Sequence, residues 1–161
     1  MTSSDWARLG LGLLVGSAAL IDVTARRIPN ALNLIVAISG VAAVLVFAPG
    51  EGWSHALHFL IALAIGAGLF AIRVIGGGDA KLYAAVALWF PLQLAIPLGA
   101  AISLAGVVLL LIYWAVKVFS STSGENSRRK IAAHTGLPYG AAIAVGTILI
   151  AFSFQSYGVR T

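Results

Sequence analysis

The chain has 161 residues, of which 60% are hydrophobic and only 9% are charged, and its net charge is +5. A soluble domain is typically about 45–50% apolar and about 25% charged. A water-soluble fold of this size cannot bury so much apolar surface, so the composition predicts an integral membrane protein. The apolar runs are continuous, which disfavours a β-barrel. The absence of cysteine excludes disulfides and thiolate metal sites.

The apolar runs divide the chain into six predicted membrane helices within one membrane-embedded domain, residues 1–161. Each run is close to the roughly 20 residues that a helix needs to cross a bilayer. We therefore expect an all-α integral membrane protein with both termini on the non-cytoplasmic side. The six predicted spans are 6–23, 31–48, 53–75, 80–96, 100–118 and 137–154.

The first run could be mistaken for a signal peptide, because it contains small residues. However, Arg26 and Arg27 follow it directly, whereas its amino-terminal end is only weakly basic, with Arg8 against Asp5. This arrangement favours a retained helix whose carboxyl end faces the cytoplasm. Pro29 then breaks the first helix, since the residue before a proline avoids the α region. Asn30 is a suitable cap for the second helix.

The end of the fourth run has two interpretations. If Pro91 ends the helix, the run has about 12 residues, or roughly 18 Å, which is too short to cross a bilayer. If Pro91 only kinks the helix and the segment 97–99 (PLG) is the turn, the run is long enough to cross. The second interpretation is preferred here.

The basic residues test this layout. With six spans, eight of the ten lysines and arginines fall on one side of the membrane, and only Arg8 and Arg160 fall on the other. Basic residues concentrate in cytoplasmic connections, so the side that carries eight is predicted to be cytoplasmic. The eight are Arg26, Arg27, Arg73, Lys81, Lys117, Arg128, Arg129 and Lys130.

Two of the five acidic residues, Asp22 and Asp79, lie at span ends on the predicted cytoplasmic side. Taken singly, Asp22 could pair with Arg26 one helical turn later, and Asp79 could be an ordinary helix cap. Taken together, two carboxylates in a partly dry site can share one proton. The ionised carboxylate can then take a proton from water, while the protonated one hydrogen-bonds a carbonyl under attack. That is the chemistry of aspartic peptidases.

Three consecutive glycines, Gly76, Gly77 and Gly78, precede Asp79. Glycine permits a positive φ and close approach of the backbone. We expect exposed backbone here to pair with an extended substrate, as in strand addition. A plain turn between helices is the alternative. A phosphate-binding loop would need more residues and a following Lys-Ser or Lys-Thr pair.

Three sequence elements together resemble the A24 family of type IV prepilin peptidases. The first is Asp22 followed by residues 27–30 (RIPN). The second is residues 76–82 (GGGDAKL), which fits the GxGD motif that the family shares with presenilin-type intramembrane proteases. The third is residues 137–140 (LPYG). The resemblance covers about residues 10–150, and the size is similar to that of the short members that serve tight-adherence (Flp-type) pili.

The resemblance implies an aspartic endopeptidase of the inner membrane that removes the short basic leader of prepilins at the cytoplasmic face. Asp22 and Asp79 would be the catalytic pair. The implied partners are a prepilin substrate and membrane lipid, without nucleic acid, metal or cofactor. Longer members also methylate the pilin and carry a cysteine-rich segment that this chain lacks, so methyl transfer is not expected. Further residues that would shape the site are Gly76, Gly77, Gly78, Lys81, Pro138, Tyr139 and Gly140.

Several features have a second interpretation. Lys81 is slightly better explained as a topological anchor than as a partner of Asp79. His55 and His58 lie three residues apart and could share a metal, but two histidines are weak evidence, and packed or interfacial side chains are favoured. The run 128–130 (RRK) is assigned to topology. A small proton-coupled transporter or a non-catalytic subunit of a pilus or secretion assembly remains the alternative function.

Overall fold

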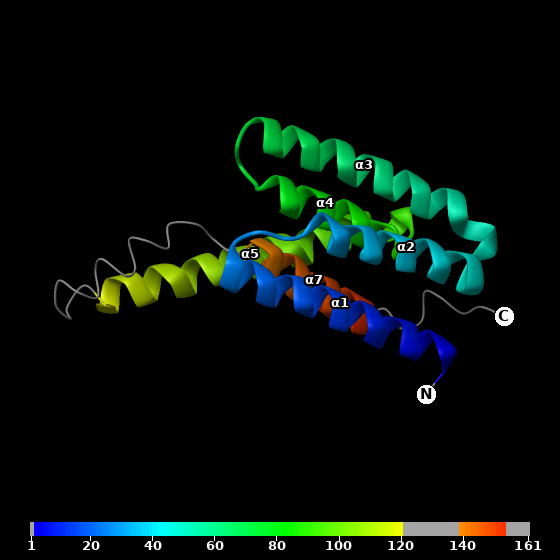
Figure 1. The fold of residues 1–161 in the computed structure, drawn as a ribbon, viewed down its shortest axis with the longest axis horizontal. Helices are drawn as coiled ribbons and strands as arrows, with labels where there is room; N and C mark the ends of the chain where they lie inside the picture. The colour runs from blue at the N-terminus through cyan, green and yellow to red at the C-terminus, as the bar shows by residue number, and fades with distance from the viewer. Residues whose placement is uncertain (1, 121–138, 154–161) are drawn as a thin grey trace.

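The structure is a computed structural model that describes residues 2–120 and 139–153, and these residues form helices without any strand (Figure 1). The predicted all-helical fold is therefore confirmed for this part of the chain. The helices are α1 (Ser3–Ala25), α2 (Asn30–Phe47), α3 (Gly52–Ala71), α4 (Gly77–Ala87), α5 (Ala95–Ser120) and α7 (Tyr139–Ser153), with two short 3-10 helices, η1 (Pro49–Glu51) and η2 (Leu92–Leu94).

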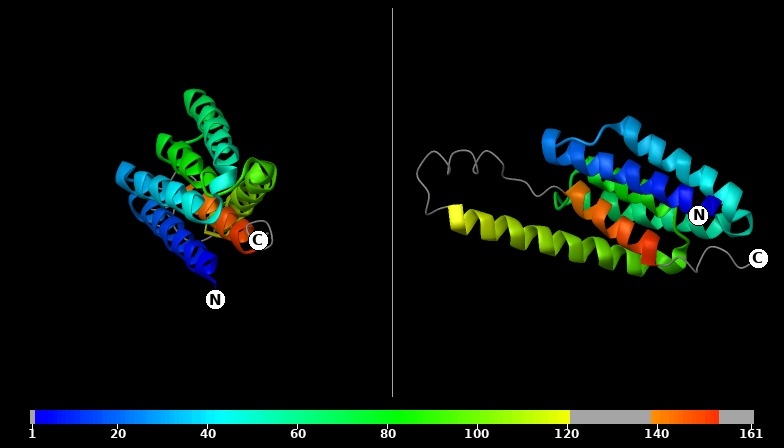
Figure 2. Two further views of the ribbon diagram at one scale, coloured as in Figure 1. Left: turned by 90° about the vertical axis from the view of Figure 1, so that its right-hand side faces the viewer. Right: turned by 90° about the horizontal axis from the view of Figure 1, so that it is seen from below.

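The helices lie roughly along one common direction (Figures 1 and 2). Helix α7 packs against α1 and α5, and α4 packs against α3 and α2 and also contacts α7. Helices α2 and α3 both rest on α4 but scarcely touch each other. The last turn of α1 and the first turns of α2, α4 and α7 meet at one end of the bundle (Figure 1). This shared end positions the candidate site.

The core consists of apolar side chains from helices that are distant in sequence. Leu11 and Val15 of α1 are buried together with Leu82 and Val86 of α4. Large apolar side chains also cover the outside of the bundle, as on α1, where Leu13 is 77% exposed. An apolar exterior matches a lipid environment, because lipid tails solvate such side chains without cost.

Four stretches of the described residues are long and apolar enough to cross a membrane: Ser3–Ala25, Asn30–Phe47, Pro49–Ala71 and Leu92–Val118. Helix α7 is apolar but shorter. These helices indicate a membrane protein. The count of six crossings and the orientation of the termini stay predictions.

The prediction of one kinked helix over 80–96 is wrong. Helix α4 ends at Ala87, and residues 88–91 turn into η2. Phe90 precedes Pro91, and a residue in that position avoids the α region. The predicted turn at 97–99 lies instead in the first turn of α5, where a proline is tolerated because its missing N–H has no partner in any case.

Side chains of α3 bind the irregular backbone that joins α4 to α5. The Nδ1 atoms of His55 and His58 lie 2.9 Å from the carbonyl oxygens of Leu88 and Phe90 respectively. Both imidazoles are buried, which confirms that these histidines are packed. Among the described residues no group of three or more histidine, cysteine or acidic side chains could hold a metal. Non-helical backbone inside a membrane protein requires such internal partners.

Candidate active site

Asp22 lies in the last turn of α1, and only 7% of it is exposed. Helix α1 ends where Arg26 adopts a left-handed conformation with φ of 53°. The backbone N–H of Gly140, the second residue of α7, donates a hydrogen bond of 2.9 Å to Asp22 Oδ2. The carboxylate therefore points into the bundle, toward the beginning of α7.

Asp79 is the third residue of α4, and Gly76 precedes the helix as its cap. The alternative in which Asp79 itself is the N-cap is therefore wrong. A carboxylate in the first turn of a helix is favoured by the helix dipole. The Oδ1 atom of Asp79 is buried and has no hydrogen-bond donor. Burial without a hydrogen-bond partner costs a charged oxygen more than a neutral one, so this position favours the carboxylic acid over the carboxylate.

Burial, and after it the nearby charge of Asp22, raise the pKa of the Asp79 carboxyl to about 6. Hydrogen bonds from the backbone N–H groups of Gly76 and Gly140 act in the opposite sense. Asp79 lies outside the four helices that are long enough to span a membrane. The N–H of Gly140 thus faces both carboxyl groups, one from α1 and one from α4.

The glycines around this pair are required by space. A Cβ atom at Gly140 would lie 2.9 Å from both Cβ and Oδ2 of Asp22, and one at Gly76 would lie 2.7 Å from Asp79 Oδ2. A Cβ at Gly78 would touch Ile28 Cβ at 3.4 Å. Real Cβ atoms essentially never approach other atoms more closely than 3.0 Å. At Gly140 and Gly76, any residue other than glycine would therefore force an aspartate to move.

The structure does not use the backbone freedom that was expected of the three consecutive glycines. Gly76 has an ordinary extended conformation with φ of −72°, while Gly77 and Gly78 already belong to α4. The residues with positive φ, apart from glycines, are Arg26 and Arg73 in the described part of the chain. The expectation of an open glycine segment that pairs with an extended substrate is therefore wrong for Gly77 and Gly78, because their backbone is helical.

Lys81 points away from the carboxyl pair. Its Nζ atom donates a hydrogen bond of 3.0 Å to Asn30 Oδ1 at the beginning of α2. The one ion pair within the described residues joins Arg8 to Asp5, so Lys81 does not pair with Asp79 here. The structure thus separates Lys81 from the two aspartates with which the sequence grouped it.

Asn33 was missed by the sequence analysis. It is buried in α2, and its Nδ2 atom donates a hydrogen bond of 3.3 Å to the carbonyl oxygen of Gly78. This bond ties α2 to the turn that presents Asp79. A polar residue inside an apolar run, three residues after Asn30 and so on the same helix face, was the available signal.

Of the remaining residues that the sequence singled out, some lie within the described part of the chain and others outside it. Tyr139 is half-buried at the first position of α7, beside Gly140. Pro138 and the basic run 128–130 lie outside the described residues.

The model of the type IV leader peptidase family matches residues 9–115, which is more than half of the chain. The chain belongs to the type IV leader peptidase family. Membership confirms the resemblance to this family and implies that the chain is a peptidase. Its long apolar helices indicate that it is a membrane protein. The match includes Asp22, Asp79 and Lys81 and ends before α7. No match was found among curated proteins or among solved structures. Gly140 lies outside the matched residues, and its contact with Asp22 is seen in the tertiary structure.

Proposed function

We propose that this chain is a membrane-embedded aspartic endopeptidase that removes the leader peptide of type IV prepilins, of the Flp-like class, at the cytoplasmic face. The observation that carries the proposal is the approach of Asp22 and Asp79 to one backbone N–H, that of Gly140. Two carboxyl groups that come from separate helices, one buried and one partly buried, form a natural acid–base pair. Family membership supports peptide hydrolysis as the reaction.

In this mechanism the pair carries a single proton. We assign the proton to Asp79, because its Oδ1 atom is buried without a donor and its pKa is raised to about 6. Asp22 is then the carboxylate that takes a proton from the attacking water, and the Asp79 hydroxyl hydrogen-bonds the scissile carbonyl oxygen. The pair titrates as a unit, so its apparent pKa values belong to both residues.

The cytoplasmic location of the site rests on charge. Arg26 follows α1, Arg73 follows α3, and Lys117 is in the last turn of α5. The carboxyl ends of these three helices point in the direction of the end where α4, which carries Lys81, begins (Figure 1). Basic residues concentrate on the cytoplasmic side of membrane proteins. The proposed site therefore faces the compartment in which a basic leader peptide is found before export.

The decisive experiment incubates the purified full-length protein with a panel of prepilins and identifies new amino termini by mass spectrometry. Asp22→Asn and Asp79→Asn should each abolish cleavage, because an amide can neither accept nor donate the transferred proton. Glu51→Gln is the matched control, since Glu51 is exposed in η1 and should tolerate the same loss of charge. Retained cleavage by both aspartate variants would falsify the assignment.

Other outcomes of this experiment favour the alternative functions. Solute flux in proteoliposomes that depends on the two aspartates, without proteolysis, would indicate a transporter. An aspartate double variant that supports pilus assembly normally would indicate a non-catalytic subunit.

A further inference from the structure

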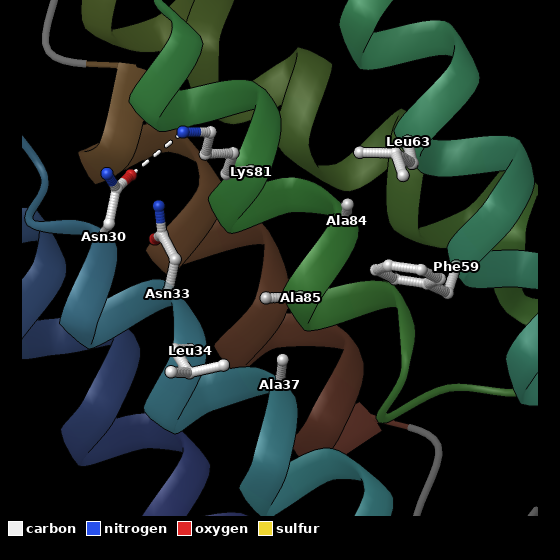
Figure 3. A pocket seen from close by; sticks show the side chains of 9 residues that line it. All are labelled: Asn30, Asn33, Leu34, Ala37, Phe59, Leu63, Lys81, Ala84 and Ala85. Atoms are coloured by element: carbon white, nitrogen blue, oxygen red, sulfur yellow. Dashed lines mark hydrogen bonds between the residues drawn. The ribbon is translucent and has the colours of Figure 1, made fainter.

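A groove lies on the opposite side of α4 from the carboxyl pair. It has a volume of about 370 Å³ and is open to the outside, and Figure 3 shows its walls. Because α2 and α3 both pack on α4 but scarcely touch each other, a groove remains between them. Ala84 and Ala85 of α4 are buried at its bottom. Helix α2 contributes Asn30, Asn33, Leu34 and Ala37 to the groove, α3 contributes Phe59 and Leu63, and α4 contributes Lys81, Ala84 and Ala85.

The groove is amphipathic along its length. Its floor is made of the small side chains Ala84 and Ala85, and larger apolar side chains such as Leu34 and Phe59 form its edges (Figure 3). Its polar end is occupied by Lys81, hydrogen-bonded to Asn30. The chemistry therefore changes from apolar to cationic toward the end of the bundle where α2 and α4 begin.

The polar end is electropositive for two reasons. The exposed ammonium of Lys81 has no carboxylate partner within the described residues. Helices α2 and α4 also both begin at this end, and helix N-termini carry partial positive charge. The carboxyl groups of Asp22 and Asp79 face Gly140 instead. An occupant with an anionic group next to an apolar chain would match this pattern.

We propose that the groove is a binding site for an anionic phospholipid, with the phosphate at Lys81 and part of an acyl chain along the exposed side chains of Leu34 and Leu63. A free phosphate would leave the apolar length of the groove uncovered, whereas a zwitterionic lipid would bring a cation toward Lys81. A basic leader peptide would be repelled by the same lysine. The inference does not depend on the proposed peptidase activity.

Native mass spectrometry of the full-length protein tests the charge of the occupant. The protein is mixed with equal amounts of phosphatidylglycerol and phosphatidylcholine that have identical acyl chains. The expected result is preferential retention of phosphatidylglycerol, reduced about fivefold in Lys81→Gln, since one lysine near a headgroup contributes on the order of 1 kcal/mol. Lys117→Gln is the matched control, because Lys117 is an exposed lysine on α5, outside the groove.

A second pair of variants tests the apolar part of the groove. Ala37→Phe places a large ring in the groove and should reduce retention of both lipids. Ala42→Phe makes the same change on the exposed face of α2 and should leave retention unchanged. Glycerol phosphate, which lacks acyl chains, should not compete with phosphatidylglycerol. Equal retention of the two lipids by the unmodified protein, identical behaviour of the two lysine variants, or competition by glycerol phosphate would each overturn the proposal.

Discussion

The backbone N–H of Gly140 donates a hydrogen bond to Asp22 Oδ2 at 2.9 Å, across 118 positions of sequence. This bond joins the end of α1 to the beginning of α7 and fixes the orientation of one candidate catalytic carboxylate. Since the same N–H also acts on Asp79, one glycine relates both acidic side chains to each other. Several testable consequences depend on this arrangement.

Gly140→Ala should inactivate the protein. The added Cβ would lie 2.9 Å from Asp22 Cβ and Oδ2 and 3.0 Å from Ile28 Cδ1, so the carboxylate must move. We expect a loss of cleavage on the order of a hundredfold, as is typical when a reacting group shifts by about 1 Å. Stability should fall by roughly 1–3 kcal/mol. Prepilin cleavage and thermal unfolding in detergent measure the two effects.

The control for this prediction is Gly16→Ala in α1, where an added Cβ has no atom within 4 Å. It should leave cleavage unchanged and stabilise α1 slightly, because alanine favours a helix over glycine by roughly 0.5–1 kcal/mol. Equal activity of the Gly140 and Gly16 variants would contradict the proposed contact.

The pH dependence of cleavage should show a falling limb on the alkaline side. The pKa of Asp79 is raised to about 6, so the shared proton is present below that pH and lost above it. The pH dependence of kcat/KM reports the pKa values of the free enzyme. The value of kcat/KM should therefore fall about tenfold per pH unit above the apparent pKa of the pair. Initial rates measured between pH 5 and 8.5 at low substrate concentration provide the test. A rate that rises steadily through pH 6 to 8 would contradict a protonated Asp79.

The stability of the protein should respond to Asp79→Asn in a pH-dependent way. A carboxyl group whose pKa is raised by folding binds its proton more tightly in the folded state, so ionisation destabilises that state. The penalty is absent below about pH 4, grows as the pH rises toward 6, and is complete above that value. Asp79→Asn should therefore unfold at a higher temperature than the unmodified protein at pH 8. At pH 4 the two should unfold at similar temperatures.

The control for the stability prediction is Glu51→Gln, since Glu51 is exposed in η1. Its unfolding temperature should follow that of the unmodified protein at both pH values. A stabilisation by Asp79→Asn that is larger at pH 4 than at pH 8 would reverse the predicted sign.

His58 should be a stability residue of the turn between α4 and α5. Its side chain is 1% exposed, and its Nδ1 atom lies 2.9 Å from the carbonyl oxygen of Phe90. His58→Ala leaves this carbonyl without its donor, which typically costs about 1–3 kcal/mol. His58→Asn places an amide nitrogen near the position of Nδ1 and should recover part of the loss. Unfolding temperatures of the two variants give the comparison, and equal losses would show that packing alone is responsible.

Sequence reasoning singled out the two aspartates because charge is rare in this chain. Only two of the five acidic residues lie at span ends on one predicted face. In the structure Asp22 is in the last turn of α1 and Asp79 in the first turn of α4, and these turns meet at one end of the bundle (Figure 1). The end of α4 was predicted wrongly because in sequence Pro91 is compatible both with the end of a helix and with a kink. The choice depends on His55 and His58, whose imidazoles satisfy the carbonyl groups of a helix that ends early.

Composition and motif order by themselves determined the membrane class, the helical fold, the family and the candidate pair of aspartates. These follow from local quantities, namely hydropathy, charge and spacing. Only the tertiary structure decided that Gly140 contacts Asp22, that Asn33 binds the carbonyl of Gly78, and that Lys81 faces a groove rather than the aspartates. Such contacts depend on how helices distant in sequence pack and rotate against one another, and apolar runs without a polar face carry little information about that rotation.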